Sequence, residues 1–241
     1  MLVYLFQKKC RLMKKYKYLL FDLDNTLLDF TGSSEVSFKK MIGQYSNKDV
    51  DYLFSEYYKI NRACWEAVER DEIPLAKVKI VRFERFNSKF DIKVSPEEIN
   101  AHYFSILRET VFFVEHAKEV LKELKSRGVG MSIVTNGLKE VQERRLEISG
   151  ILPFFDTVII SDAIGVKKPE EAFFTYTLNQ VPKFEKDQYL VIGDTPGSDI
   201  LGAYNSNLPS CWFNPKNKSW TATGYKPDHN ISSLFDLLDL I

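Results

Sequence analysis

Cysteine and histidine are both scarce in this sequence of 241 residues. The three cysteines and three histidines lie far apart, and no two cysteines form a C-x-x-C pair. An odd number of separated cysteines indicates no disulfide framework, so we expect a reducing, cytoplasmic location. The same scatter removes the ligand spacing that is typical of a zinc site.

Net charge and long apolar runs are absent as well. The 33 lysines and arginines balance the 33 aspartates and glutamates, so the formal net charge is zero. Binding to nucleic-acid polymers needs excess positive charge to displace counterions, so we expect no such partner. No apolar run approaches the roughly 20 residues of a transmembrane helix, so we expect no membrane partner. A small anionic substrate remains compatible with this composition.

The N-terminal segment differs in pattern from the rest of the chain. An apolar run at 2–6 precedes a basic run at 8–17, and it is shorter than the roughly 7–15 apolar residues of a signal peptide. We expect Met13 to be the natural start and residues 1–12 to be an N-terminal extension without a function. A weak membrane-surface anchor is the alternative interpretation.

The remaining sequence predicts an α/β fold. A buried-strand pattern at 18–21 is followed by apolar residues at helical spacing from 33 to 107. Beyond these, helices alternate with four short apolar strands, at 131–134, 158–160, 189–192 and 211–213. Strict alternation is typical of a parallel sheet. We therefore predict a Rossmann-like parallel-sheet core (13–30 and 108–241) with an inserted all-helical cap domain (31–107).

Polar side chains follow four of the predicted strands. In chain order they are Asp22 and Asp24, Thr135, Lys168, and Asp194 with Asp199. Because the carboxyl ends of parallel strands meet at one edge of a sheet, these side chains should converge. Carboxylates bind hard cations, a lysine neutralises phosphate, and a hydroxyl with backbone amides holds phosphate oxygens. The set is complementary to a phosphate group and a cation.

The same clusters resemble the four ordered motifs of the haloacid dehalogenase superfamily. Residues 22–26 match its first motif, D-x-D-x-T, and Thr135 matches the second. Lys168-Pro169 matches the third, and residues 193–199 match the fourth, G-D-x-x-x-x-D. Lys167 is interpreted as a solvated neighbour, because the family's lysine immediately precedes proline. The helical insertion lies where this superfamily places its C1-type cap.

The resemblance implies a role for each motif residue. Asp22 would attack phosphorus and form an aspartyl-phosphate. Asp24 would protonate the leaving oxygen and then deprotonate the attacking water. Thr135, with the backbone of Asn136, would hold the phosphoryl oxygens. Lys168 would orient Asp22 and offset negative charge.

The resemblance also implies Mg²⁺ as the cofactor. Its ligands would be Asp22, Asp194 and the main-chain carbonyl of Asp24. Asp199 would support these ligands or contact the metal itself, and a helix N-cap is its other interpretation. The metal is needed because a carboxylate that approaches a phosphate dianion is otherwise repelled.

A narrower resemblance links the chain to the noncanonical pyrimidine nucleotidase (5′-nucleotidase) family of bacteria. It covers the segments 21–30, 135–137, 145–147, 165–169, 193–202 and 211–214, with Asn61, Trp65, Ile73, Arg82 and Phe83 in the cap. One departure is Asp71, where the family pattern has glycine. The departure bears on the turn that presents the cap to the substrate.

This narrower resemblance implies a small-molecule phosphate ester as substrate. The ester would be a pyrimidine nucleoside 5′-monophosphate such as dUMP, UMP or dTMP. A closing cap would exclude water and bring aromatic side chains to the base. Trp65 is a candidate for stacking on the base, and packing in the cap core is its alternative role. We expect a monomer or a homodimer.

Other activities use the same superfamily fold. A dehalogenase lacks the second aspartate of the first motif, because halide leaves without protonation, so Asp24 argues against that reaction. A phosphonatase needs a cap lysine that forms a Schiff base, and Lys39, Lys59 and Lys77 are candidates. A phosphatase for sugar phosphates or other small esters, a phosphomutase and a non-catalytic binding protein are further alternatives. The intact motif set argues against the last of these.

Overall fold

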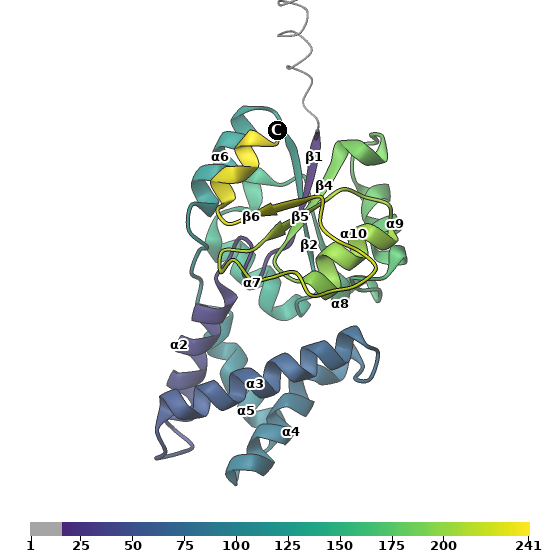
Figure 1. Ribbon diagram of the computed structural model, residues 1–241. Helices are drawn as coiled ribbons and strands as arrows, with labels where there is room; N and C mark the ends of the chain where they lie inside the picture. The colour runs from purple at the N-terminus through teal and green to yellow at the C-terminus, as the bar shows by residue number, and fades with distance from the viewer. Residues whose placement is uncertain (1–15) are drawn as a thin grey trace, which may run out of the picture.

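The computed structural model describes residues 16–241, so the predictions for residues 1–12 and for Met13 lie outside the described residues. Six parallel strands form one sheet in this range, in the order β3-β2-β1-β4-β5-β6 (Figure 1). The strands are β1 (Tyr18–Phe21), β2 (Gly130–Thr135), β3 (Thr157–Ile160), β4 (Tyr189–Gly193), β5 (Ser210–Phe213) and β6 (His229–Ile231). The predicted α/β class and the five predicted strands are confirmed, and β6 is an addition.

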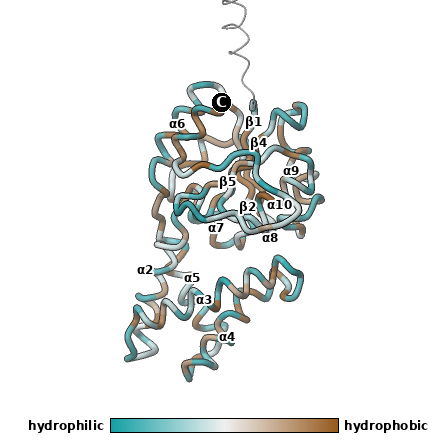
Figure 2. The backbone as a smooth tube through the Cα atoms, in the orientation of Figure 1, coloured by the Kyte–Doolittle hydropathy of each residue, from teal (hydrophilic) through white to brown (hydrophobic). Residues whose placement is uncertain are grey.

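Helices cover both faces of the sheet. On one face lie α6 (Ala117–Ser126), α7 (Lys139–Ser149), η2 (Leu152–Phe154) and η5 (Leu234–Asp239). On the other lie α9 (Glu171–Gln180) and α10 (Leu201–Asn205). Along β1, Leu19 and Phe21 pack into the first layer, whereas Tyr18 and Leu20 pack into the second. Both faces of β1 are thus buried, which explains its uninterrupted apolar sequence (Figure 2).

The predicted helical segment forms four helices apart from the sheet (Figure 1). They are α2 (Phe30–Ile42), α3 (Val50–Glu69), α4 (Val78–Phe90) and α5 (Pro96–Leu107), with the short turn η1 (Leu75–Lys77) between α3 and α4. An aromatic-rich apolar cluster holds them together, and it includes Phe38, Tyr57, Phe83, Phe86 and Tyr103. These helices therefore share one core, which Leu138 and Val141 at the start of α7 extend toward the sheet.

Local signals set several helix ends. Asp29 accepts a hydrogen bond from the Gly32 N–H and caps α2, and Ser95 caps α5 through the Glu98 N–H. The helix α6 ends before Gly128, whose φ of 70° suits glycine. The remaining short elements are α8 (Ser161–Ile164), η3 (Lys186–Gln188) and the π-turn η4 (Pro196–Ile200).

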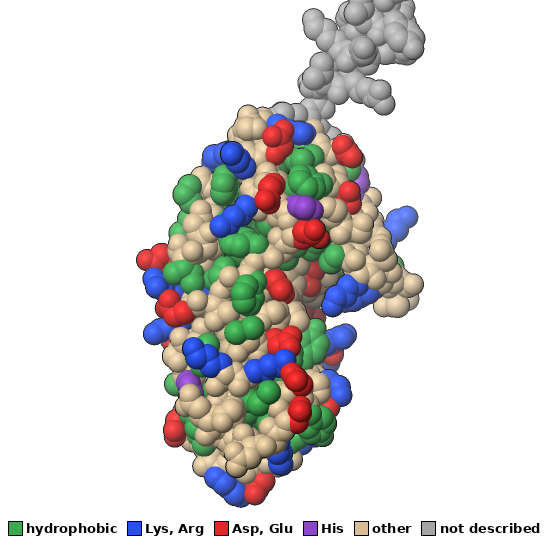
Figure 3. All heavy atoms as spheres, turned by 90° about the vertical axis from the view of Figure 1, so that its left-hand side faces the viewer, with side chains coloured by type: hydrophobic (Ala, Val, Ile, Leu, Met, Phe, Trp, Pro, Cys, Tyr) green, Lys and Arg blue, Asp and Glu red, His purple; other side chains and the backbone are tan. Residues whose placement is uncertain are grey.

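The parallel strands place all their carboxyl ends on the side of the sheet that faces α2–α5 (Figure 1). On the face of the molecule seen in Figure 3, side chains of both charges are interspersed, as the balanced composition requires. Within residues 16–241, no helix combines the length and the apolar character needed to cross a membrane.

Candidate active site

Asp22 follows β1 directly and is buried at the carboxyl edge of the sheet. Its carboxylate accepts a hydrogen bond from Lys168 Nζ at 2.8 Å and another from Thr26 Oγ1 at 3.1 Å. Burial raises the pKa of Asp22 well above its usual range, and the Lys168 ammonium partly opposes this increase. Asp22 is thus held in one orientation by a cation.

Lys168 is the centre of a buried network. Its ammonium group donates to Asp22 Oδ1, to Asp199 Oδ1 at 2.6 Å and to the Val134 carbonyl at 2.8 Å. These contacts use all three N–H donors of a lysine. Burial alone would lower the pKa of Lys168, but the carboxylates of Asp199 and Asp22 raise it above its ordinary value. Lys168 therefore stays charged beside Asp22.

Asp199 has both carboxylate oxygens engaged. Oδ1 accepts from Lys168, and Oδ2 accepts from the Thr195 N–H at 3.0 Å. Gly193 makes this packing possible, because a Cβ at this position would lie 2.2 Å from Asp199 Cγ. Any larger residue at position 193 would displace Asp199. The geometry suits Asp199 to holding Lys168 and the loop after β4.

Thr135 and Asn136 lie at the end of β2. The Thr135 hydroxyl oxygen accepts hydrogen bonds from the Gly137 N–H at 3.0 Å and from Gln142 Nε2 at 3.1 Å. Its own O–H thus remains available as a donor. The Asn136 side chain donates to the Lys168 carbonyl at 2.8 Å and accepts from the Lys168 N–H at 2.9 Å. Asn136 therefore joins the end of β2 to the loop between α8 and α9.

Two residues outside the predicted set hold Asp24. Arg145 Nη1 donates to Asp24 Oδ1 at 2.6 Å, and Gln142 Nε2 donates to Asp24 Oδ2 at 2.7 Å. Both lie on α7, three residues apart, so helical spacing puts them on one side of the helix. In the sequence, the sign of this role is the three-residue spacing of Gln142 and Arg145 on the helix that follows Thr135. Gly137 leaves room for Gln142, since a Cβ there would approach Gln142 Nε2 to 2.1 Å.

Three carboxylates gather at the same edge. Asp22, Asp194 and Asp199 each offer an oxygen within 4.8 Å of the others. Lys168 alone does not balance them, and burial, followed by the charge of Asp199, raises the pKa of Asp194 to about 7. Thr195 donates to Asp194 Oδ1 at 3.0 Å, and no described residue donates to the other oxygen. The three carboxylates thus supply more oxygen ligands and more negative charge than the described residues neutralise, which fits a hard divalent cation.

A cavity of about 430 Å³ lies between these groups and the helices α3–α5. Asp22, Asp24 and Lys168 line it from the sheet, whereas Trp65 and Arg82 line it from the helices. Its volume lies within the range of small-molecule sites. Trp65 also packs against the cluster around η1, so contact with a ligand and packing are both open to it.

The three cap lysines considered for a Schiff base do not line this cavity in the described part of the chain. Lys39 pairs instead with Glu35, and Lys59 pairs with Glu56. Among the described residues 31–107, no lysine lines this cavity.

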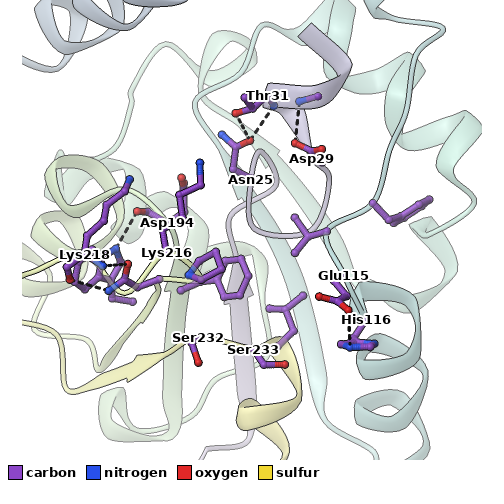
Figure 4. Close-up of a pocket in the computed structure, with 18 of the residues that line it drawn as sticks. Asn25, Asp29, Thr31, Glu115, His116, Asp194, Lys216, Lys218, Ser232 and Ser233 are labelled. Atoms are coloured by element: carbon purple, nitrogen blue, oxygen red, sulfur yellow. Dashed lines mark hydrogen bonds and ion pairs between the residues drawn. The ribbon is translucent and has the colours of Figure 1, made fainter. Parts of the chain in front are cut away.

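A second cavity, of about 550 Å³, lies beside Asp194. Figure 4 shows Asn25 in the loop after β1 and Thr31 at the start of α2 on one side, and Lys216 and Lys218 on the loop after β5 on the other. Asn25 Oδ1 accepts from both the N–H and the hydroxyl of Thr31, each at 2.9 Å. Asp194 lines both cavities, so it can be approached from either side.

The turn after α3 contacts the sheet domain beside the site. Asp71 forms an ion pair with Lys167 at 2.6 Å, so Lys167 has a partner and is not simply a solvated neighbour. Asp71 has a φ of 59°, a left-handed conformation that favours glycine and that aspartate tolerates better than most other residues. Glu69 lies close to Gly197, since a Cβ there would be 2.8 Å from Glu69 Oε2.

Residues 19–213 match the family model described as haloacid dehalogenase-like hydrolase. This match covers strands β2–β5 and nearly all of β1, the helices α2–α5, and every residue from Asp22 to Asp199 that is described above. The chain therefore belongs to the haloacid dehalogenase-like hydrolase family.

Individual relatives are similar over nearly the whole chain. The pyrimidine 5′-nucleotidase PynA of Streptococcus pneumoniae is 30% identical over 226 residues, which cover 94% of this chain and 95% of PynA. The pyrimidine 5′-nucleotidase YjjG of Escherichia coli is 30% identical over 227 residues, with 94% and 98% covered. A crystal structure of the HAD-hydrolase YfnB of Bacillus subtilis, bound to magnesium and described as revealing interdomain movement, superposes with a TM-score of 0.87. It is 28% identical and covers 94% of this chain and 99% of YfnB.

Proposed function

We propose that this chain is a Mg²⁺-dependent phosphomonoesterase that hydrolyses pyrimidine nucleoside 5′-monophosphates through an aspartyl-phosphate. The observation that carries the proposal is the meeting of Asp22, Lys168 and Asp194 at one sheet edge, with Asp24 lining the same cavity. The set supplies a nucleophile, a fixed positive charge, a cation ligand and a proton donor. The names of PynA and YjjG support the same substrate class.

In the first step, a carboxylate oxygen of Asp22 attacks phosphorus, and the bond from phosphorus to the leaving oxygen breaks. The electron pair goes to the leaving oxygen, which takes a proton from Asp24. The free O–H of Thr135 and the N–H of Asn136 donate to the phosphoryl oxygens, and Lys168 offsets their negative charge.

In the second step, water attacks the phosphorus of the aspartyl-phosphate while Asp24 takes the proton of the water. The bond to Asp22 breaks, and inorganic phosphate leaves. We assign Arg145 and Gln142 as positioning residues, because each donates to one oxygen of Asp24 and neither touches Asp22. They hold the acid and base in place between the two steps.

Asp22, Asp194 and the main-chain carbonyl of Asp24 would hold Mg²⁺. When bound, the cation neutralises charge between the nucleophile and the phosphate. Asp199 supports the site through Lys168, because both of its oxygens already accept hydrogen bonds.

Residues 31–107 are proposed to act as a cap over a core of residues 13–30 and 108–241. The proposal is supported by the apolar cluster that joins α2–α5, to which the sheet side adds only Leu138 and Val141 among its buried residues, and by the cavity between these helices and the strand ends. Cap and core would separate to admit the substrate and close to exclude water. The interdomain movement described for YfnB supports such a motion.

The test is phosphate release from dUMP, UMP, dTMP, CMP and a set of sugar phosphates, with Mg²⁺ and with chelator. We expect release that depends on Mg²⁺ and favours the pyrimidine nucleotides. Asp22→Asn should lower it by at least about 10⁴-fold, because the amide is not a nucleophile for phosphorus. Asp91→Asn is the matched control, since Asp91 is exposed and pairs only with Lys93 on the far side of the cap.

Release mainly from sugar phosphates would keep the mechanism and overturn the pyrimidine assignment. Release that survives both chelator and Asp22→Asn would overturn the mechanism. A requirement for a bisphosphate activator would instead indicate a phosphomutase.

A further inference from the structure

Arg82 is a buried cation for which the described residues supply no acidic partner. It lies on α4 and is 2% exposed. Nη1 donates to Asn61 Oδ1 at 3.2 Å and Nη2 donates to Asn100 Oδ1 at 2.9 Å, whereas Nε is buried without a hydrogen-bond partner. A buried charge normally pairs with an opposite charge, because its removal from water is costly. Two neutral amides do not supply that charge.

Aromatic rings supply the rest of its surroundings. The guanidinium carbon lies 5.1 Å from the ring centre of Phe83 and 5.2 Å from those of Tyr103 and Phe104. Contacts with ring faces stabilise a cation without using its N–H donors. Arg82 and Phe104 both line the cavity that contains Asp22. The cap therefore presents an oriented arginine with a spare donor to the same cavity as the nucleophile.

We infer that Arg82 is a specificity-determining residue that donates a hydrogen bond to a carbonyl oxygen on the leaving group of the substrate. The inference rests on the proposed function, which puts the phosphate at Asp22 and the rest of the ester in this cavity. Arginine has N–H donors and no acceptor. The amide oxygens of Asn61 and Asn100 are already used by Arg82. This end of the cavity is therefore matched to an acceptor.

That match sets a preference among bases. Uracil and thymine carry two ring carbonyl groups, whereas cytosine has an amino group in place of one of them. If the amino group of cytosine faced Arg82, the N–H groups of both would lack an acceptor. A buried N–H group without an acceptor weakens binding. With the 4-position of the base toward Arg82, Arg82 favours uracil and thymine nucleotides over cytosine nucleotides, because cytosine has its carbonyl only at the 2-position.

A second phosphate group fits the cavity less well than a neutral carbonyl. Glu66 and Glu69 line the same cavity from α3, and Phe30, Leu107 and Val141 add apolar walls. A dianion in this cavity would share it with two carboxylates, whereas a neutral planar ring would meet apolar surface. The observations therefore favour a carbonyl-bearing ring over a bisphosphate.

The test compares kcat/KM for dUMP, dCMP and p-nitrophenyl phosphate in the full chain with Mg²⁺. Arg82→Gln removes the cation. Asn100→Asp places a carboxylate on Arg82 from a position outside the cavity lining, so it neutralises the charge without changing the cavity wall. Arg85→Gln, an exposed arginine on the same helix, is the control for loss of one positive charge.

Arg82→Gln and Asn100→Asp should each lower the ratio of kcat/KM for dUMP to that for p-nitrophenyl phosphate by at least about tenfold. The preference for dUMP over dCMP should shrink in parallel, and Arg85→Gln should keep both ratios. If Arg82→Gln fails to fold, Arg82→Lys decides, because it keeps a positive charge at this position and removes the guanidinium N–H donors. Unchanged ratios in an active variant of Arg82 would overturn the inference and leave the proposed function intact. A wild-type protein that hydrolyses none of the three esters would overturn both.

Discussion

The sheet edge and the cap face the same cavity, but they treat charge differently. At the sheet edge, Lys168 has three acceptors and both oxygens of Asp24 have donors. In the cap, Arg82 has only amide partners, and Glu69 has no hydrogen-bond or ion-pair partner among the described residues. At the sheet edge most charges are paired before any ligand arrives, Asp194 being the exception, whereas Arg82 and Glu69 in the cap have no partner of opposite charge among the described residues.

The difference separates chemistry from recognition. Paired charges hold their positions, so the core is preorganised for one reaction. Unpaired charges in a cavity gain most from a ligand, because the ligand supplies the missing partner. We expect substitutions in the core to change the reaction, and substitutions in the cap to change which ester is accepted. Three predictions follow the comparison: one concerns the reaction at the core, one the unpaired charge of Glu69, and one the contact between cap and core.

The largest effect is expected for Asp24→Asn in the core. The amide cannot protonate the leaving oxygen, so hydrolysis of dUMP, whose leaving group is an alkoxide, should slow by about 10²–10⁴-fold. Formation of the aspartyl-phosphate from p-nitrophenyl phosphate should slow by much less, because p-nitrophenolate leaves without a proton. Single-turnover kinetics with both esters measure the difference. Equal losses for the two esters would show that Asp24 is not the proton donor.

A smaller effect is expected for Glu69→Gln in the cap. Burial, followed by the charge of Asp199, raises the pKa of Glu69 from its ordinary value of 4.5 to about 7. The folded protein therefore binds a proton that the unfolded chain releases, and stability falls as pH rises from about 4.5 to 7. Glu69→Gln should remove this decline, with a gain of about 1–2 kcal/mol over wild type at pH 8 and little change at pH 5.

Urea unfolding in the presence of chelator at the two pH values measures this gain. The raised pKa of Asp194 affects the pH dependence of wild type and of Glu69→Gln in the same direction. Only the difference in unfolding free energy between the two proteins therefore reports on Glu69. Glu66→Gln is the control, because Glu66 lies on the same helix and already pairs with exposed Arg62. An equal gain at pH 5 and pH 8 would contradict the assignment to a buried, unpaired carboxylate.

The smallest effect is expected at the contact between cap and core. Asp71→Asn keeps a residue that tolerates a left-handed backbone and removes only the charge that pairs with Lys167. Because the Asp71 side chain is 81% exposed, the loss should be at most about 1 kcal/mol and should vanish in 1 M salt. Urea unfolding at low and high salt measures it. A larger loss that is independent of salt would mean that the turn itself has been disrupted.

Much of the fold was predictable from local pattern. Strands β1 to β5 are apolar runs that end at polar or glycine residues, and the helices α2–α5 repeat apolar residues at helical spacing. The strand β6 was not predicted, because it is three residues long and begins with His229 and Asn230. It adds to the sheet by pairing with β5, and a short polar sequence carries no periodicity that would reveal such pairing.

The candidate site divides in the same way. Asp22, Asp24, Thr135, Lys168 and Asp194 were predictable, because each follows a strand and the ends of parallel strands converge. The sequence by itself therefore determined the fold class and the type of chemistry. The tertiary structure decided which charges are paired. Arg145 reaches Asp24 across 121 positions and Lys167 reaches Asp71 across 96, while Arg82 has two amides as its hydrogen-bond partners among the described residues. Such pairing depends on how helices pack in three dimensions, and local sequence spacing does not contain that information.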